Sequence, residues 1–433
     1  MVGTGVFVAT AHNVVVTVRN TTVFVLPTTT SDTKKLVHFE VLQGADGVVE
    51  ALESDDDEDQ AEKLKKKQAT KPAAPANRIT AIKLFRPHGW EILALLLLVD
   101  ERRLVYYELN LSAETLLLKA SRSVPRSATC MTVGHLKLDN GEIKYAVIVG
   151  QKTGEAVAVP FPDVARDLKT LLGHTTSMVT DVAVNHNSSL LLTADRDEKL
   201  RVSRFPNATI IESYCLGHTA SLTKLACSSV TPELVVTTSM DNTLKLWNMM
   251  TGKLLATKML LPDVQVSVEP LDEVNDNDND SGRKAAKSLL NVSLAICHKT
   301  NIVAVLVNYQ YVRFFEIVSV SGVSTLKEVI ISSEDEQLLL ANEPCELLFT
   351  EDEMLVISYK KKPFLQLFSI SKGHNRKLSP VDAMTDVFND FRNAAATIEL
   401  VDDEQKALDV LEGGLKKKKA RTNEWKKNMP RGK

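Results

Sequence analysis

The chain has 433 residues, of which 44% are apolar and 25% are charged, close to the averages for globular proteins. This composition excludes a chain that is disordered throughout, and the length allows two or three ordinary domains or one large repeat architecture. No apolar run reaches the ~18 residues of a membrane-spanning helix. The N-terminal residues have no basic segment ahead of a continuous apolar stretch. We therefore expect a protein that is neither membrane-embedded nor secreted.

The formal net charge of −3 conceals an uneven distribution of charge. Residues 416–433 carry nine Lys or Arg residues against the single acid Glu424, a net +8, which leaves −11 on the rest of the chain. A basic tail of this kind favours contact with a polyanion, a nuclear localisation signal or simply a solvated end, and the first two roles are compatible.

The cysteines are few and dispersed, with no CxxC pair among them. This spacing argues against a disulfide framework and against a structural zinc site. We expect reduced, buried thiols in a cytosolic or nuclear protein. The five residues are Cys130, Cys215, Cys227, Cys297 and Cys345.

Short runs rich in Val, Ile, Leu, Phe and Tyr, separated by turn residues, recur over residues 1–370 and predict an all-β domain. Two charged stretches, 53–76 and 269–287, lack the apolar content needed for packing and are predicted to be disordered inserts. Seven units of strand-like runs can be counted, and six or eight remain alternatives. The units are 3–43, 78–110, 125–161, 171–205, 217–254, 288–318 and 342–369.

The fourth and fifth units share a repeat spacing. Each opens with a Gly-His pair, and the two histidines, His174 and His218, are 44 positions apart. Trp247 follows His218 by 29 positions, and Ser203 stands at the same distance from His174. A Gly-His start and a Trp end at this period are typical of a WD-repeat β-propeller, so we predict a seven-bladed propeller.

Such a blade is held together by a local chain of hydrogen bonds. We expect His218 to bond a strand hydroxyl, Thr237 or Ser239, that also accepts the indole N–H of Trp247, and we expect the blade turn to lie at Asp241. At the corresponding turn of the fourth unit, Asp197 is assigned the same structural role as Asp241.

After residue 370 the pattern becomes helical, which gives a helical and basic extension over 371–433. Ser379 and Pro380 are predicted to begin a helix, and a further helix is expected to run to Leu411. The apolar stripe of the first helix either docks on the propeller or fills a partner's groove. Its residues are Val381, Met384, Phe388, Phe391, Ala395 and Ile398.

Motifs for catalysis, nucleotide binding or metal binding are not found. The sequence contains no GxxxxGK[ST], GxSxG or HExxH, and its histidines show no metal-ligand spacing. We therefore expect an interaction platform with no catalytic residue, no bound metal and no cofactor of its own.

One segment of the propeller has an unusual density of charge. The run ADRDEKLRVSR places Arg196, Glu198, Lys199 and Arg201 within six positions, and IESYCLGHT follows it. From the residues alone, such a cluster is either a solvated turn with internal ion pairs or a surface that orients a partner.

Residues 193–203, TADRDEKLRVS, and residues 211–219 closely resemble the non-catalytic WD-repeat subunit of the eukaryotic tRNA (guanine-N7-)-methyltransferase. The resemblance implies a heterodimer in which a separate Rossmann-type subunit holds S-adenosylmethionine and methylates a guanine in the tRNA variable loop. It also implies that Glu198 and Arg201 support the subunit interface, with Arg196 and Lys199 as neighbours. The expected location is the nucleus, and the alternative function is a general nuclear scaffold, for example in ribosome assembly.

The basic tail is predicted to contact tRNA phosphates, with Trp425 able to stack on a base. The residues assigned to this contact are Lys416, Lys417, Lys418, Lys419, Arg421, Lys426 and Lys427.

Overall fold

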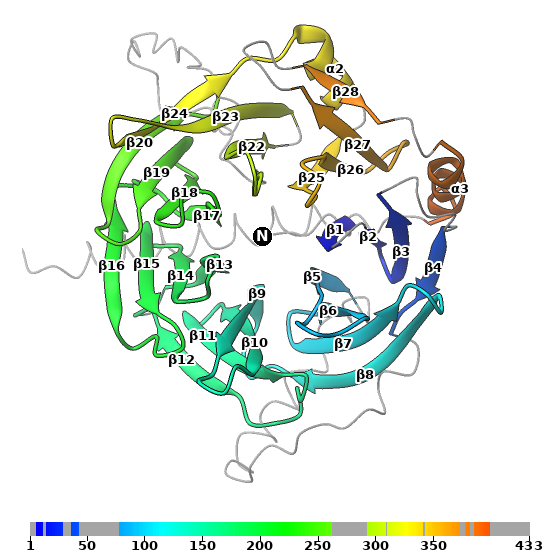
Figure 1. Ribbon diagram of the computed structural model, residues 1–433, viewed down its shortest axis with the longest axis horizontal. Helices are drawn as coiled ribbons and strands as arrows, with labels where there is room; N and C mark the ends of the chain where they lie inside the picture. The colour runs from blue at the N-terminus through cyan, green and yellow to red at the C-terminus, as the bar shows by residue number, and fades with distance from the viewer. Residues whose placement is uncertain are drawn as a thin grey trace, which may run out of the picture.

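The computed structural model is a ring of seven four-stranded antiparallel sheets, the blades of a β-propeller (Figure 1). The predicted all-β, seven-bladed fold is thereby confirmed. The structure describes residues 6–11, 14–28, 36–42, 78–175, 177–261, 292–308, 310–340, 343–371, 377–381 and 385–398.

Each blade is formed by four strands that are consecutive in the sequence. Blades 1 and 2 contain β1 (Val6–Ala11), β2 (Val14–Arg19), β3 (Thr22–Pro27), β4 (Val37–Glu40), β5 (Ile79–Phe85), β6 (Leu93–Val99), β7 (Arg103–Asn110) and β8 (Thr115–Ser123). Blades 3 and 4 contain β9 (Ala128–Lys137), β10 (Ile143–Gln151), β11 (Glu155–Phe161), β12 (Lys169–Gly173), β13 (Val179–Val184), β14 (Leu190–Asp195), β15 (Lys199–Arg204) and β16 (Ile211–Leu216). Blades 5 to 7 contain β17 (Leu222–Cys227), β18 (Leu234–Ser239), β19 (Thr243–Asn248), β20 (Lys253–Met259), β21 (Val292–Ile296), β22 (Ile302–Val307), β23 (Tyr311–Val320), β24 (Val323–Val329), β25 (Pro344–Phe349), β26 (Leu355–Tyr359), β27 (Leu365–Ile370) and β28 (Leu378–Pro380).

The apolar core lies between neighbouring blades. The second strands of six blades, β2, β6, β14, β18, β22 and β26, are buried along their whole length, as their runs of Val, Leu and Ile require. Each cluster of buried apolar side chains joins two adjacent blades, for example blades 1 and 2 or blades 5 and 6. A blade therefore buries its faces only when its neighbours are present, so the ring is stable as a whole.

The outer strands explain why six of the seven predicted units, all but the first, ended too early. Strands such as β8 and β20 alternate partly buried and exposed residues, so they lack the continuous apolar run of the inner strands. The last blade likewise extends beyond residue 370, because β28 pairs with β27.

Two helices are present in the described part of the chain, α2 (Ser333–Leu340) and α3 (Thr385–Ala395). α2 was not predicted, because its eight residues have little helical periodicity. The predicted helix start at Ser379 and Pro380 is wrong. Both residues lie in β28, an outer strand on which Pro is tolerated, since the unpaired edge needs no N–H donor.

The stripe on α3 does dock on the propeller, as one of the two alternatives predicted. Phe388, Phe391 and Ala395 are buried against blades 1 and 7. The predicted inserts at 53–76 and 269–287, the helix running to Leu411 and the basic tail all lie outside the described residues. Neither described helix has the length and hydropathy needed to cross a membrane.

Candidate functional site

Blade 5 contains the hydrogen-bond chain that its sequence predicts. The indole N–H of Trp247 donates to Thr237 Oγ1 over 2.8 Å, and Thr237 Oγ1 lies 2.8 Å from Nε2 of His218. Nδ1 of His218 is in turn 2.8 Å from a carboxylate oxygen of Asp241. The structural roles predicted for His218, Asp241 and Trp247 are confirmed, and Thr237 rather than Ser239 supplies the hydroxyl.

In blade 4 the carboxylate that binds the histidine comes from a different position than in blade 5. His174 lies 2.7 Å from Thr193 Oγ1 and 2.9 Å from a carboxylate oxygen of Asp195. The assignment of Asp197 to this role is therefore wrong. Asp195, at the end of β14, is buried and also accepts the backbone N–H of Lys199, whereas Asp197 is exposed in the turn. Burial alone would raise the pKa of Asp195, but these hydrogen bonds hold it below its usual range.

Arg201 occupies an internal position in the same blade, 8% exposed. Its Nε donates to Ser203 Oγ over 2.9 Å, and its two terminal nitrogens donate to the carbonyl oxygens of Gly173 and Ala208. Ser203 stands where blade 5 has Trp247. Arg201 was predicted to support the subunit interface; its guanidinium binds Gly173 of blade 3 as well as Ser203 and Ala208 of blade 4, so it joins the two blades.

The other three predicted interface residues are exposed together. Arg196, Glu198 and Lys199 lie in or beside the turn that joins β14 to β15. We call this segment, residues 196–199, the charged turn.

Glu198 has a left-handed backbone conformation, with φ of +73°. In the equivalent turns of blades 1, 3 and 5, the left-handed position is held by Asn20, Gly154 and Asn242. Gly and Asn adopt this conformation at little cost, whereas Glu is disfavoured there by about 1 kcal/mol. Glu101, in the corresponding turn of blade 2, has the same left-handed conformation with φ of +59°, so the strain at Glu198 is shared by a second blade.

An exposed apolar surface lies next to the charged turn on the outer strands of blades 4 and 5. Leu216, 59% exposed, pairs directly with Lys199 across β15 and β16. We call these exposed residues the apolar strip: Ile211, Tyr214, Leu216, Met250, Leu254 and Met259.

The two outer strands that carry the strip, β16 and β20, follow one another along the green edge of the ring in Figure 1. Strands β16 and β20 contact each other. Ser213 Oγ donates to Met249 O over 2.6 Å, and the backbone of Gly252 approaches the carbonyl of Tyr214 so closely that a Cβ would lie 2.3 Å from its oxygen. The strip was not predicted, because in the sequence the Ile, Tyr and Leu residues of β16 do not differ from those of a buried strand.

Charged side chains also gather on inner strands. Lys224 of β17 faces Asp181 of β13 and Glu346 of β25; the field of Asp181, followed by that of Glu346, raises the pKa of Lys224 despite its burial. Burial raises the pKa of Glu346, which also accepts the backbone N–H of Val8 over 2.9 Å. Two hydrogen bonds of these carboxylates link neighbouring blades, since Asp181 also accepts the backbone N–H of Leu225 in blade 5.

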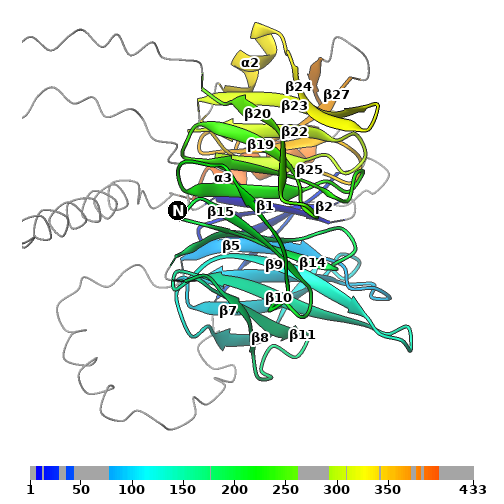
Figure 2. The same cartoon turned by 90° about the vertical axis from the view of Figure 1, so that its left-hand side faces the viewer.

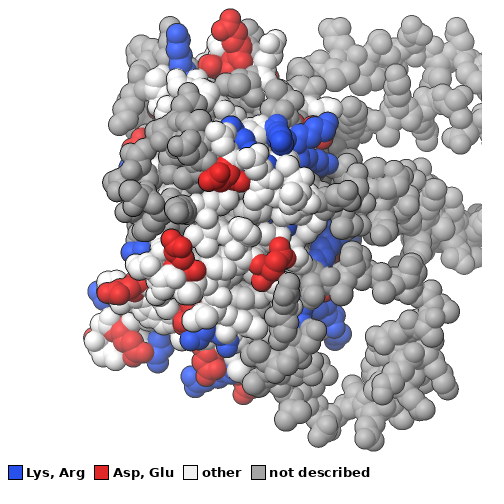
Figure 3. Space-filling view, turned by 90° about the vertical axis from the view of Figure 1, so that its right-hand side faces the viewer, with Lys and Arg blue, Asp and Glu red and all other residues white. Residues whose placement is uncertain are grey.

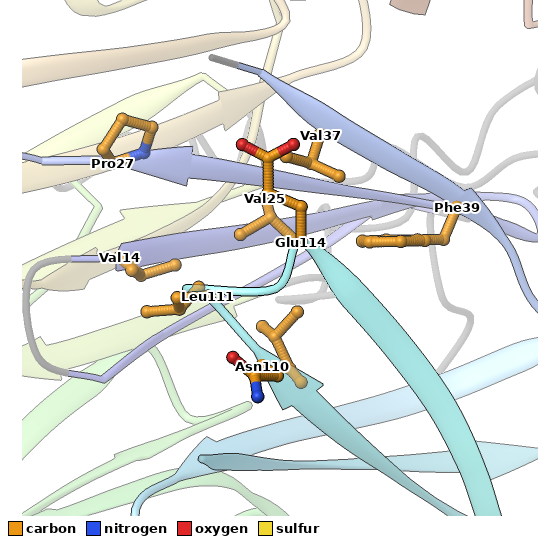
Figure 4. A pocket seen from close by; sticks show the side chains of 9 residues that line it. Val14, Val25, Pro27, Val37, Phe39, Asn110, Leu111 and Glu114 are labelled. Carbon is orange, nitrogen blue, oxygen red and sulfur yellow. The ribbon is translucent and has the colours of Figure 1, made fainter. Parts of the chain in front are cut away.

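One apolar depression opens between blades 1 and 2 (Figure 4). Its walls are mostly Val, Leu, Pro and Phe, and its polar lining residues are Asn110 and Glu114, which supply no nucleophile paired with a base. Within the described ranges, no group of three or more His, Cys, Asp or Glu side chains is placed to hold a metal ion.

The side of the ring that carries α3 shows interspersed charges of both signs with uncharged surface between them (Figure 3). Opposite the charged turn and the apolar strip, the described surface in this view therefore presents no large field of one sign. Figure 2 views the ring from the opposite side, across the green blades that carry the charged turn and the apolar strip.

Comparison with known proteins identifies similar sequences. Residues 109–362 match the tRNA methyltransferase TRM82 WD40 domain family. The chain is 32% identical over 177 residues to the tRNA (guanine-N(7)-)-methyltransferase non-catalytic subunit wuho of Culex quinquefasciatus, covering 40% of each protein. It is 44% identical over 91 residues to the corresponding subunit wdr4 of Dictyostelium discoideum, covering 21% of this chain and 19% of that protein.

A third relative is the non-catalytic subunit trm82 of Sclerotinia sclerotiorum, 37% identical over 153 residues, with 34% of this chain and 28% of that protein covered. The chain thus spans about two fifths or less of the length of these curated relatives. The family match covers more than half of the chain and includes the whole of blades 3, 4, 5 and 6. The chain therefore belongs to the tRNA methyltransferase TRM82 WD40 domain family.

Proposed function

We propose that the protein is the non-catalytic subunit of a tRNA (guanine-N7-)-methyltransferase. In this proposal a separate catalytic subunit holds S-adenosylmethionine and transfers its methyl group to a guanine in the tRNA variable loop. The propeller binds and positions that subunit and helps to hold the tRNA, and the complex acts in the nucleus. The family membership of the chain and the names of its relatives support this reading.

The observation that carries the proposal is the pairing of the charged turn with the apolar strip. The strip gathers six exposed apolar side chains on and beside two adjacent outer strands, and interface cores are enriched in aromatic residues and Met, as here at Tyr214 and Met259. Mixed charges beside such a surface give a partner its orientation and specificity. We assign the strip and the turn together to the catalytic subunit.

The function is tested by native purification of the tagged chain, followed by an assay of the eluate for methyl transfer from S-adenosylmethionine to guanine N7 of tRNA. We expect activity that is lost when the co-purified subunit is stripped away and regained when it is returned. An inactive eluate that contains other nuclear proteins would instead support the general scaffold.

Leu216→Asp is expected to weaken binding of the catalytic subunit about 100-fold, because it places a charge in the desolvated centre of the interface. Titration of the partner by calorimetry measures the change. The matched control is Leu117→Asp, which alters a leucine 55% exposed on the outer strand of blade 2. Equal loss of affinity in both variants would remove the apolar strip from the interface.

The tail proposal predicts a change in salt dependence. Deleting residues 415–433 is expected to weaken tRNA binding and to flatten the plot of log affinity against log salt, because each lost phosphate contact contributes about 0.7–0.9 to the slope. Binding is measured for the intact complex at several salt concentrations. Trp425→Leu is the control that removes stacking alone, so it should lower affinity without changing the slope. An unchanged slope after the deletion would contradict tail contact with phosphates.

A further inference from the structure

The junction between blades 1 and 7 differs from the other six junctions of the ring. Successive blades are connected by the chain itself, but blades 1 and 7 contain the first and last described strands. Among the described strands, no sheet combines segments from both ends of the chain. The ring is therefore closed at this junction, which we call the seam, by side-chain contacts.

Two side chains, Arg19 and Glu346, make hydrogen bonds directly across the seam. Arg19 of β2 donates to the carbonyl oxygens of Tyr359 and Lys360 in blade 7, over 3.2 and 3.3 Å. Glu346 of β25 accepts the backbone N–H of Val8 in β1. These contacts join blade 1 to blade 7 without a shared strand.

The α3 helix covers the seam and contacts both blades. The ring of Phe391, fully buried, packs edge-on against Phe24 of blade 1 at a centroid distance of 5.1 Å and lies 6.5 Å from the ring of Phe364 in blade 7. The guanidinium of Arg19, in blade 1, lies over the ring of Phe364 in blade 7, 4.3 Å from the ring centroid. Side chains from blade 1, blade 7 and α3 thus interlock in one cluster.

We infer that α3 is a latch that closes the propeller in place of a strand shared between the first and last blades. Phe391 is its central contact, because it packs against both sides of the seam. Displacing α3 leaves Phe24 and Phe364 facing water and opens the ring locally at this one junction. Figure 1 shows the position of α3 on the rim beside β3 and β4.

The inference is tested by hydrogen exchange of the full-length chain, measured by mass spectrometry. In Phe391→Ala we expect amide exchange in β1, β2, β26 and β27 to rise about tenfold or more, while exchange in β13–β16 changes little, since local opening exposes only the elements that depend on the lost contact. Phe391→Leu should show the same pattern with a smaller rise in amide exchange, and this variant replaces Phe391→Ala in the test if the alanine variant does not fold.

Two matched variants separate a latch from general destabilisation. Phe315→Ala removes an equally buried phenylalanine from the core between blades 5 and 6, so its effect should centre on β21–β24 and spare the seam. Asn393→Ala changes an exposed residue of α3 and should leave exchange at the seam unaltered. An equal rise in all seven blades in Phe391→Ala, or faster exchange confined to α3, would overturn the inference.

Discussion

Replacing Arg201 with Met is expected to lower the free energy of unfolding by about 3 kcal/mol, because the carbonyl oxygens of Gly173 and Ala208 and the hydroxyl of Ser203 lose their donor together. Methionine keeps much of the volume of the side chain, so the loss reflects hydrogen bonding and not a cavity. Chemical denaturation monitored by circular dichroism measures the difference.

Two variants in the same strand and turn sharpen this test. Arg201→Lys retains the charge but lacks the planar, forked guanidinium, so we expect it to recover only a part of the lost stability. Glu198→Asn replaces a residue with φ of +73° by one that tolerates this conformation, so its stability should be unchanged or higher. Its affinity for the proposed catalytic partner should nevertheless fall.

The variants at Arg201 and Glu198 thereby test stability and partner binding separately within one charged run. If Arg201→Met is as stable as the wild type, the guanidinium does not support blade 4. If Glu198→Asn binds the partner normally, the strained glutamate is not a recognition residue.

The sequence was sufficient to predict the propeller because its signals are local and repeated. His218, Thr237, Asp241 and Trp247 are close in sequence, and their hydrogen bonds fix the blade without long-range information. The repeat period of 44 residues aligns Asp197 with Asp241 and so predicted the wrong acid. In the structure the carboxylate beside His174 belongs to Asp195, two positions earlier. A repeat spacing identifies a turn but does not identify which of its acids turns inward.

The candidate site was predicted only in part for a related reason. Arg196, Glu198, Lys199 and Arg201 have the same charged character in sequence, yet Arg201 lies in the buried middle of β15 while the other three lie exposed in the turn or at the start of the strand. The role of Arg201 depends on the carbonyl of Gly173, which is 28 positions away, and on the hydroxyl of Ser203, which accepts its Nε–H. The apolar strip depends on the contact between β16 and β20, which sequence periodicity cannot reveal.

Asp241→Asn is expected to cost about 2 kcal/mol of stability at neutral pH, and the cost should shrink in acid. Burial alone would raise the pKa of Asp241, but hydrogen bonds from His218, Thr243 and the backbone N–H of Thr219 outweigh it and hold that pKa well below the usual range. A carboxyl whose folded pKa is lowered stabilises the protein above its unfolded pKa of about 3.9, and this stabilisation is lost as the pH falls towards the folded value.

The difference between wild type and Asp241→Asn should therefore be constant from pH 7 to about pH 5 and narrow below about pH 4. Denaturant titrations at each pH give the two curves. Asp197→Asn is the matched control, since its side chain is exposed in the corresponding turn of blade 4, and its stability should stay within about 0.5 kcal/mol of the wild type. If the difference in free energy of unfolding between wild type and Asp241→Asn stays the same down to pH 3, the ionised carboxylate is not what stabilises the blade at this turn.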